Sequence, residues 1–185
     1  VLNNQSASLE RAVAENRLYV VDFAQFESAT SDIFHNEQRY ITAPIALFYW
    51  NDAPPKGYPP LVPGGAQGVM QPICIQLAQK FDAETAPIFT PNNCSDANDP
   101  NLLKWRAAKY NVNAVAAMQH ESVAHLGDCH LIIEPIVVAS NRQLSVQHPV
   151  MTLLKPHFRF TININDDALT GLIAPGGVVA VNVGV

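Results

Sequence analysis

Charged side chains are scarce in this chain of 185 residues, where they occupy 15% of the positions. A soluble domain that stands alone usually has about a quarter of its residues charged and covers its surface with them. Hydrophobic residues make up 48% of the chain, which is too much for an intrinsically disordered protein of such low charge. The composition therefore predicts a folded protein whose surface is covered in part by another domain or another chain.

The sequence also lacks basic runs, and its net charge is −5. Because binding to nucleic acid needs clustered Lys and Arg, we expect no nucleic-acid partner. No apolar run approaches the roughly 18 residues of a membrane span, so we expect no transmembrane segment. The three cysteines, Cys74, Cys94 and Cys129, form no CxxC pair, which argues against a zinc ribbon or a redox pair.

The two ends of the chain suggest that it continues beyond them. The first residue is Val1, and no signal peptide precedes the globular pattern. The last ten residues, 176–185, form a strand-like apolar run without a polar cap. We therefore expect this chain to be a piece of a larger protein.

Residues 1–100 predict a part rich in strands and loops. Ser8 caps an expected short helix over residues 8–16, and a buried strand is expected over residues 17–23. Further strands are expected over residues 40–50 and 71–77. Residues 54–63, with five prolines, and residues 86–99, rich in turn formers, predict loops.

Residues 101–185 predict a helical part that holds five of the six histidines. Pro100 suits a first helical position, with Asp99 as its cap. Apolar residues then recur at spacings of three, four and seven as far as His130, which predicts one long amphipathic helix. These residues are Leu102, Trp105, Ala108, Val112, Val115, Ala116 and Val123. A helix of about 30 residues spans roughly 45 Å, which is long for so short a chain.

Chemistry-bearing residues gather at the end of this helix. His125 and His130 are five residues apart, so on an ideal α-helix they project about 140° apart and cannot bind one metal ion. A π-bulge would bring both rings to one face, and Gly127 between them lowers the cost of that distortion. Two other pairs, Glu121 with His125 and His130 with Glu134, are four apart and share a face without distortion. Spacing alone leaves a helical carboxylate site built from Glu121, His125 and Glu134 open.

The sequence after the histidines carries a longer pattern. It reads H-x4-H-x3-E-P from His125, then A-S-x-R-x-L-S-x-x-H-P, then L-L-x-P-H and finally I-N-x-x-A, ending at Ala168. In this order and spacing, the pattern resembles the lipoxygenases, which are non-haem iron dioxygenases of polyunsaturated fatty acids. The resemblance runs without a gap from about Leu103 to Val179. More weakly, residues 9–22, 43–48 and 72–77 are similar to a helix and three strands of the same family.

The resemblance implies that residues 1–185 are a fragment of a single lipoxygenase catalytic domain. Its fold would be mainly α with short β strands, built around a long central helix with a π-bulge. His125 and His130 would be ligands of non-haem iron, while the remaining ligands would lie outside this chain. His35, His120, His148 and His157 are interpreted as structural.

The resemblance also assigns positions along the substrate channel. Glu121 matches a polar residue four before the first ligand, and Leu172 and Val179 match apolar positions beside the reacting carbon. Ala168 matches the position whose Ala or Gly correlates with the side of oxygen attack, and Ala there is typical of S-type enzymes. This chain departs from the family at Asp166, Asp167 and the Leu169-Thr170-Gly171 that follows Ala168.

The implied activity is dioxygenation of a polyunsaturated fatty acid. Hydrogen is removed from the methylene of a cis,cis-pentadiene unit, and dioxygen adds to the radical to give a hydroperoxide. The expected partners are the fatty acid, dioxygen and the rest of the catalytic domain. The alternative is an inactive fragment or structural module that keeps the helix but lacks a complete iron site. The sequence leaves a cytoplasmic and an exported location equally open.

Overall fold

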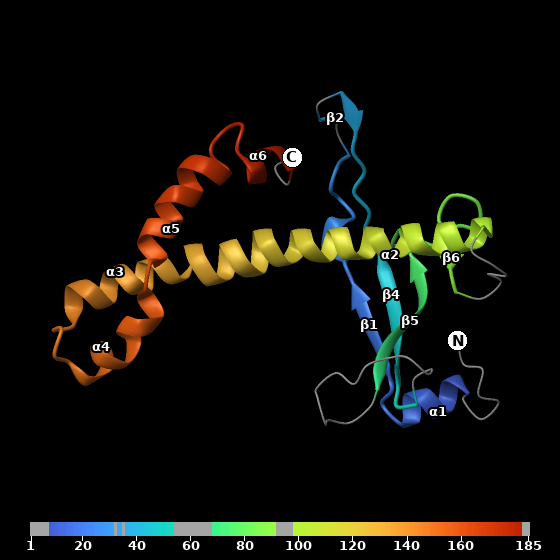
Figure 1. Ribbon diagram of the computed structural model, residues 1–185, viewed down its shortest axis with the longest axis horizontal. Helices are drawn as coiled ribbons and strands as arrows, with labels where there is room; N and C mark the ends of the chain where they lie inside the picture. The colour runs from blue at the N-terminus through green and yellow to red at the C-terminus, as the bar shows by residue number, and fades with distance from the viewer. Residues whose placement is uncertain (1–7, 32, 35, 54–67, 92–97, 183–185) are drawn as a thin grey trace. The chain divides into compact units, whose positions relative to one another are not determined.

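The computed structural model describes residues 8–31, 33–34, 36–53, 68–91 and 98–182 (Figure 1). A small antiparallel sheet lies in the first half of the chain, and helices dominate the second half. The expected fold class, mainly α with short β strands, is confirmed. Two compact units are distinguished, Val1–Asp32 with Arg39–Val115 and Ile33–Gln38 with Ala116–Val185.

The first unit begins with the predicted short helix. Helix α1 spans Leu9–Ala14, and the Ser8 hydroxyl accepts a hydrogen bond of 3.1 Å from the Arg11 amide. This side-chain bond satisfies one amide that has no partner inside the helix. Asn16, with a φ of 54°, reverses the chain after α1 and leads into strand β1, Leu18–Asp22. A short 3-10 turn, η1, follows at Ala24–Phe26.

Four strands form the main sheet in the order β1-β4-β5-β6, and every neighbouring pair is antiparallel (Figure 1). Strand β4 spans Ile45–Asn51, β5 spans Val69–Gln76 and β6 spans Ile88–Phe89. The pairing of β4 with β5 shifts between Leu47, opposite Cys74, and Phe48, opposite Pro72. A bulge at this point accommodates Pro72, whose nitrogen carries no hydrogen for the ladder.

Two expectations for this region change. Strand β1 was expected to be buried, but Tyr19 is 49% exposed and Val20 is 65% exposed. The reason is that β1 is an edge strand of the sheet. Strand β6 lies inside the expected loop over residues 86–99, while residues 92–97 of that loop and the whole of 54–63 fall outside the described residues.

One helix runs without a break from Pro100 to Gln143. It consists of α2, Pro100–Met118, a π-helical segment η2, Gln119–Leu131, and α3, Ile133–Gln143. Asp99 caps it as expected, since its Oδ1 accepts a hydrogen bond of 2.8 Å from the Asn101 amide. Of the expected apolar face, Trp105, Ala108, Val112 and Val115 are buried.

This helix bears on the expectation of no transmembrane segment. Among the described residues it is the one helix long and apolar enough to cross a membrane, with a mean hydropathy of 1.3 over its most apolar window. Core helices of soluble proteins pass the same test, so one such helix is weak evidence for a membrane span.

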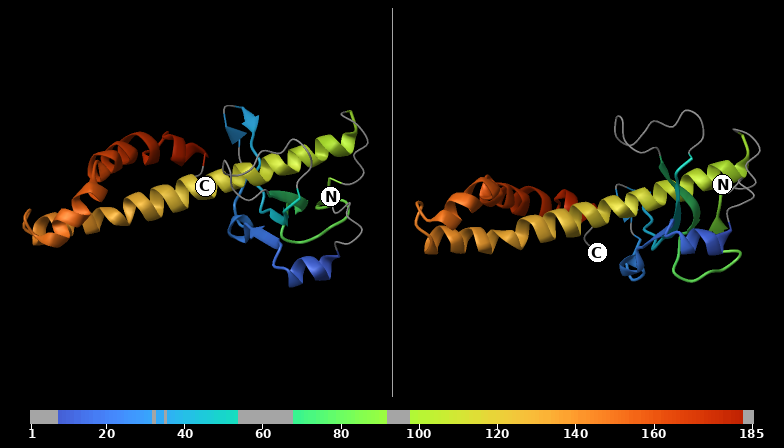
Figure 2. Two further views of the ribbon diagram at one scale, coloured as in Figure 1. Left: turned by 60° about the horizontal axis from the view of Figure 1, so that its bottom comes forward. Right: turned by 90° about the horizontal axis from the view of Figure 1, so that it is seen from below.

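The chain then turns back in short helical pieces. These are α4, Pro149–Leu154, the 3-10 turn η3, Lys155–Phe158, α5, Thr161–Ala168, a second π-helical segment η4, Leu169–Ile173, and α6, Val178–Asn182. Both views of Figure 2 show α5 lying beside the second half of the long helix. Val137, Met151, Thr161, Asn165 and Ala168 form the buried centre of this unit. The unit also includes a two-stranded hairpin of β2, Ile33–Phe34, and β3, Glu37–Gln38.

The strand expected at the end of the chain is a helix instead, over Val178–Asn182. Its valines favour a strand by local propensity, but such preferences are weak against tertiary context. Gly176, with a φ of 86°, turns the chain after η4, and α6 then packs against η4.

The sheet offers a direct test of its core. Ile75 is 1% exposed on β5, and Ile88 is 50% exposed on the neighbouring strand β6. Ile75→Ala should lower the free energy of unfolding by about 2–4 kcal/mol, because a buried cavity replaces the side chain. Ile88→Ala, the matched control, should cost well under about 1 kcal/mol. Chemical denaturation measures both values, and equal losses would contradict this placement of the core.

Candidate metal centre and adjoining pocket

The two histidines five residues apart meet on one side of η2. Their Nε2 atoms lie 3.1 Å apart, and the ring centroids lie 4.8 Å apart with the planes at 69°. The π-helical geometry brings them together, since it closes hydrogen bonds five residues apart, as in the 3.0 Å bond from the Ile132 amide to the Gly127 carbonyl. The expected π distortion is therefore present and extends over 13 residues.

A side-chain oxygen lies within hydrogen-bond distance of the Nδ1 atom of each ring. His125 Nδ1 lies 3.0 Å from Glu121 Oε2, and His130 Nδ1 lies 3.1 Å from Asn165 Oδ1. An oxygen acceptor at Nδ1 selects the neutral tautomer that carries its proton there. The two Nε2 lone pairs then face each other, an arrangement that a cation between them would stabilise.

The separation of these nitrogens fits a shared metal ion. Metal–imidazole bonds of about 2.0–2.1 Å, meeting near a right angle, place two nitrogens about 3 Å apart. Imidazole ligands suit iron, zinc, copper and nickel. Among the described residues, no group of three or more His, Cys, Asp or Glu could hold a metal ion. His125 and His130 could therefore supply two ligands to a metal ion, and the described residues group no third His, Cys, Asp or Glu with them.

Glu121 is ionised beside this pair. The hydrogen bond from His125 lowers the pKa of the Glu121 carboxyl, partial loss of hydration opposes this, and electrostatic attraction to the His120 and His125 rings lowers it further. His120 Nε2 lies 3.7 Å from Glu121 Oε1, and its ring stacks on that of His125 with centroids 6.0 Å apart. Glu121 thus favours the tautomer of His125 that carries its proton on Nδ1.

A pocket of about 430 Å³ opens in front of the histidines. All six residues singled out from the sequence line it: Glu121, His125, His130, Ala168, Leu172 and Val179. The remaining lining residues are Ala117, Met118, Ser122, Leu126, Ile164 and Val178, which are predominantly apolar. A pocket with this lining would receive a hydrocarbon chain and present it to the Nε2 pair.

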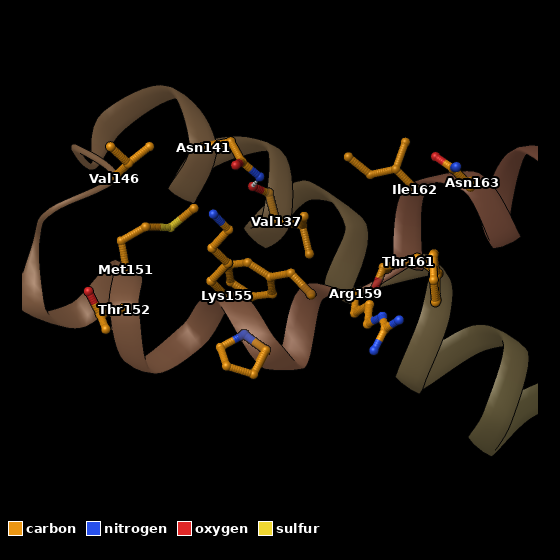
Figure 3. Close-up of a pocket in the computed structure, with 13 residues that line it drawn as sticks. Val137, Asn141, Val146, Met151, Thr152, Lys155, Arg159, Thr161, Ile162 and Asn163 are labelled. Carbon is orange, nitrogen blue, oxygen red and sulfur yellow. Dashed lines mark hydrogen bonds between the residues drawn. The ribbon is translucent and has the colours of Figure 1, made fainter.

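A second, larger pocket of about 700 Å³ lies between α3 and the returning segment (Figure 3). Figure 3 shows the Lys155 and Met151 side chains between Val146 on one side and Val137 on the other. Asn141 Nδ2 donates a hydrogen bond of 2.8 Å to the Val137 carbonyl at its edge. This pocket contains none of the residues singled out from the sequence.

The other histidines are separate from the pair or peripheral to it. His148 caps α4, where its Nδ1 accepts a hydrogen bond of 3.2 Å from the Val150 amide. His157 lies exposed on η3, and His35 falls outside the described residues. The carboxylate alternative required the His125 and His130 rings to point apart, whereas they converge, and Glu134 bonds to Asn165 instead.

Sequence reasoning missed Asn165. It stood in the I-N-x-x-A pattern without a role, yet it is 1% exposed and contacts both His130 and Glu134. The available signal was its spacing from Ala168: three residues apart, they share a face of α5.

Comparison with known proteins identifies relatives over almost the whole chain. The lipoxygenase family model matches residues 2–184. The chain is 32% identical to lipoxygenase 7, chloroplastic, of Oryza sativa subsp. japonica, over 93% of this chain and 17% of that protein. It is 31% identical to hydroperoxide isomerase ALOXE3 of Rattus norvegicus, over 92% of this chain and 21% of that protein. The chain thus spans about a fifth of the length of these curated relatives.

Solved structures agree in fold. A calcium-dependent 11R-lipoxygenase superposes with a TM-score of 0.75 at 30% identity, over 98% of this chain and 24% of that one. A lipoxygenase in complex with arachidonate gives a TM-score of 0.73 at 27% identity, over 95% and 24%. A manganese lipoxygenase gives 0.64 at 25% identity, over 96% and 26%.

Two glycines near the pocket should respond oppositely to alanine. A Cβ on Gly177 would lie 2.4 Å from the Leu172 carbonyl oxygen, so the pocket wall must shift, and Gly177→Ala should cost about 1–3 kcal/mol of unfolding free energy. A Cβ on Gly127 meets only the Ser122 carbonyl oxygen at 3.5 Å, so Gly127→Ala should stabilise the helix by up to about 1 kcal/mol. Thermal unfolding distinguishes them, and strong destabilisation by Gly127→Ala would mean that the π segment needs this glycine.

Proposed function

This chain belongs to the lipoxygenase family, and we propose that it is the part of a lipoxygenase catalytic domain that supplies two histidine ligands of a non-haem iron and one wall of a fatty-acid pocket. The observation that carries this proposal is the 3.1 Å approach of the His125 and His130 Nε2 atoms at the mouth of an apolar pocket. The remaining iron ligands come from segments outside this chain.

The substrate we propose is a polyunsaturated fatty acid with a cis,cis-pentadiene unit. The lining of the 430 Å³ pocket is mostly hydrocarbon, so burial of an acyl chain displaces water from both surfaces. The solved relative with bound arachidonate supports this substrate class. When bound, iron would supply one-electron redox chemistry: an electron and a proton leave the methylene between the two double bonds, dioxygen adds to the carbon radical, and return of the electron with a proton gives the hydroperoxide.

The residues of this chain have separate tasks in that reaction. His125 and His130 present neutral imidazole lone pairs, and Glu121 and Asn165 hold the protons on the opposite ring nitrogens. Leu172 and Val179 enclose the acyl chain and keep water from the radical. Ala168, 4% exposed, leaves space beside the reacting carbon because its side chain is small.

The alternative is that the 185-residue chain by itself is a catalytically inactive module. Two imidazoles form a weak metal site, and the described residues offer no group of three ligands. Manganese is a further candidate for the native metal, because one solved relative is a manganese lipoxygenase. The relative named a hydroperoxide isomerase makes isomerisation of a hydroperoxide the competing activity.

Metal analysis combined with oxygen uptake tests the proposal. The native protein that carries this sequence should hold one iron per chain and consume dioxygen with linoleate. His125→Ala and His130→Ala should each lose iron and oxygen uptake together, because each removes a ligand, while His157→Ala serves as the matched control and should keep both. The 185-residue chain alone should show neither.

Three results would contradict this account. Stoichiometric iron with turnover by the isolated chain would exclude the inactive-module alternative and the need for outside ligands. Manganese in place of iron would correct the metal. Conversion of a fatty-acid hydroperoxide without dioxygen uptake would replace dioxygenation with isomerisation.

Ala168 should control the side of oxygen attack. Ala168→Gly opens space at the buried end of α5, so the hydroperoxide should change from mainly the S to a larger share of the R enantiomer. Chiral chromatography of the linoleate product measures this share. Ala174→Gly, outside the pocket lining, is the matched control, and an equal shift in both variants would remove Ala168 from this role.

A further inference from the structure

The most deeply buried polar side chain near the histidine pair is that of Asn165. It is 1% exposed on α5, while His130 and Glu134 belong to the long helix. Its Oδ1 lies 3.1 Å from His130 Nδ1, and its Nδ2 donates bonds of 3.0 Å to the His130 carbonyl and 2.7 Å to Glu134 Oε2. A buried amide usually needs all its hydrogen bonds, and these three fill most of its capacity.

The two acceptors around Nδ2 fix the direction of the amide. The His130 carbonyl and the Glu134 carboxylate can only accept, so the nitrogen of Asn165 must face them. The amide oxygen is then directed at His130 Nδ1. Because this oxygen can only accept, the His130 proton lies on Nδ1 and the Nε2 lone pair faces His125.

We propose that Asn165 is a positioning residue, with Glu134 as its support, that holds His130 in the Nδ1-protonated tautomer with Nε2 directed at the metal position. His125 has a different kind of hydrogen-bond partner, since Glu121 is an exposed carboxylate on the same helix. Asn165 lies on α5, so its hydrogen bond connects the His130 ring to the helix that also carries Ala168 of the pocket.

The coupling has a functional consequence. Asn165 and Ala168 are both buried and three residues apart on α5, so the side chain that orients His130 also sets where the pocket wall lies. A shift of α5 would move both the pocket wall and the hydrogen bond behind His130. The Asn165 amide thereby links the position of His130 to that of Ala168.

The tautomer of His130 can be measured directly. In the metal-free native protein with ¹⁵N-labelled histidine at pH 8, the single ring proton of neutral His130 should lie on Nδ1. Asn165→Leu removes the acceptor at similar volume, so His130 should lose that preference. His125, held by Glu121, is the internal control and should not change.

Metal retention provides the second measurement, and this part rests on the proposed function. Loss of a residue that orients a ligand typically weakens metal binding about 10–100-fold, so Asn165→Leu should weaken iron binding to that extent. Asn163→Leu, on the exposed side of the same helix, is the matched control and should leave binding, tautomer and melting temperature unchanged.

The outcomes separate the two proposals. A wild-type His130 protonated at Nε2, or an unchanged tautomer in Asn165→Leu, would overturn the role of Asn165 even if the protein binds iron. If Asn165→Leu does not fold, the tautomer of His130 in the wild-type protein still tests the role of Asn165. Failure of the wild-type protein to bind iron would overturn the proposed function, while the Nδ1-protonated tautomer would still support Asn165 as the residue that positions His130.

Discussion

The approach of two imidazole Nε2 atoms to 3.1 Å is the contact on which the rest of the site depends. An ideal α-helix would separate rings five residues apart, and the π-helical segment η2, Gln119–Leu131, brings them to one face. Two facing lone pairs at this distance repel each other, and a cation between the rings or a proton on one Nε2 atom would relieve that repulsion. Glu121 and Asn165 provide acceptors at the two Nδ1 atoms. The π-helical segment brings the two rings together, and the Asn165 amide orients one of them. The apolar pocket adjoins both rings.

The chain exposes several large apolar side chains. Leu153 is 68% exposed, Val178 is 60% exposed and Phe160 is 58% exposed, although charged residues are only 15% of the sequence. The chain spans about a fifth of its curated relatives, and we attribute these apolar faces to contacts with the rest of a lipoxygenase catalytic domain. On this account, two histidines are sufficient here because the other ligands belong to the segments that cover these faces.

Much of this arrangement could be predicted from the sequence. The five-residue spacing of His125 and His130 left two arrangements open, and the resemblance to the lipoxygenases favoured the π-bulge that is present. The cap at Asp99 marked the start of the helix. Local propensity failed where neighbours decide the structure: the valine-rich end forms α6, and β1 is exposed at a sheet edge. Asn165 could not be found by spacing from His130, because 35 residues separate them and only the return of α5 brings them together. That Gly127 lowers the cost of the distortion stays a prediction; a Cβ would have room at this position.

The central claim is that His125 and His130 share one metal ion. Anomalous diffraction from crystals of the native protein, recorded on both sides of the iron absorption edge, tests it most directly. The account predicts one iron peak between the two rings, about 2 Å from each Nε2 atom. An iron peak away from this pair, or rings turned apart around an empty position, would contradict it.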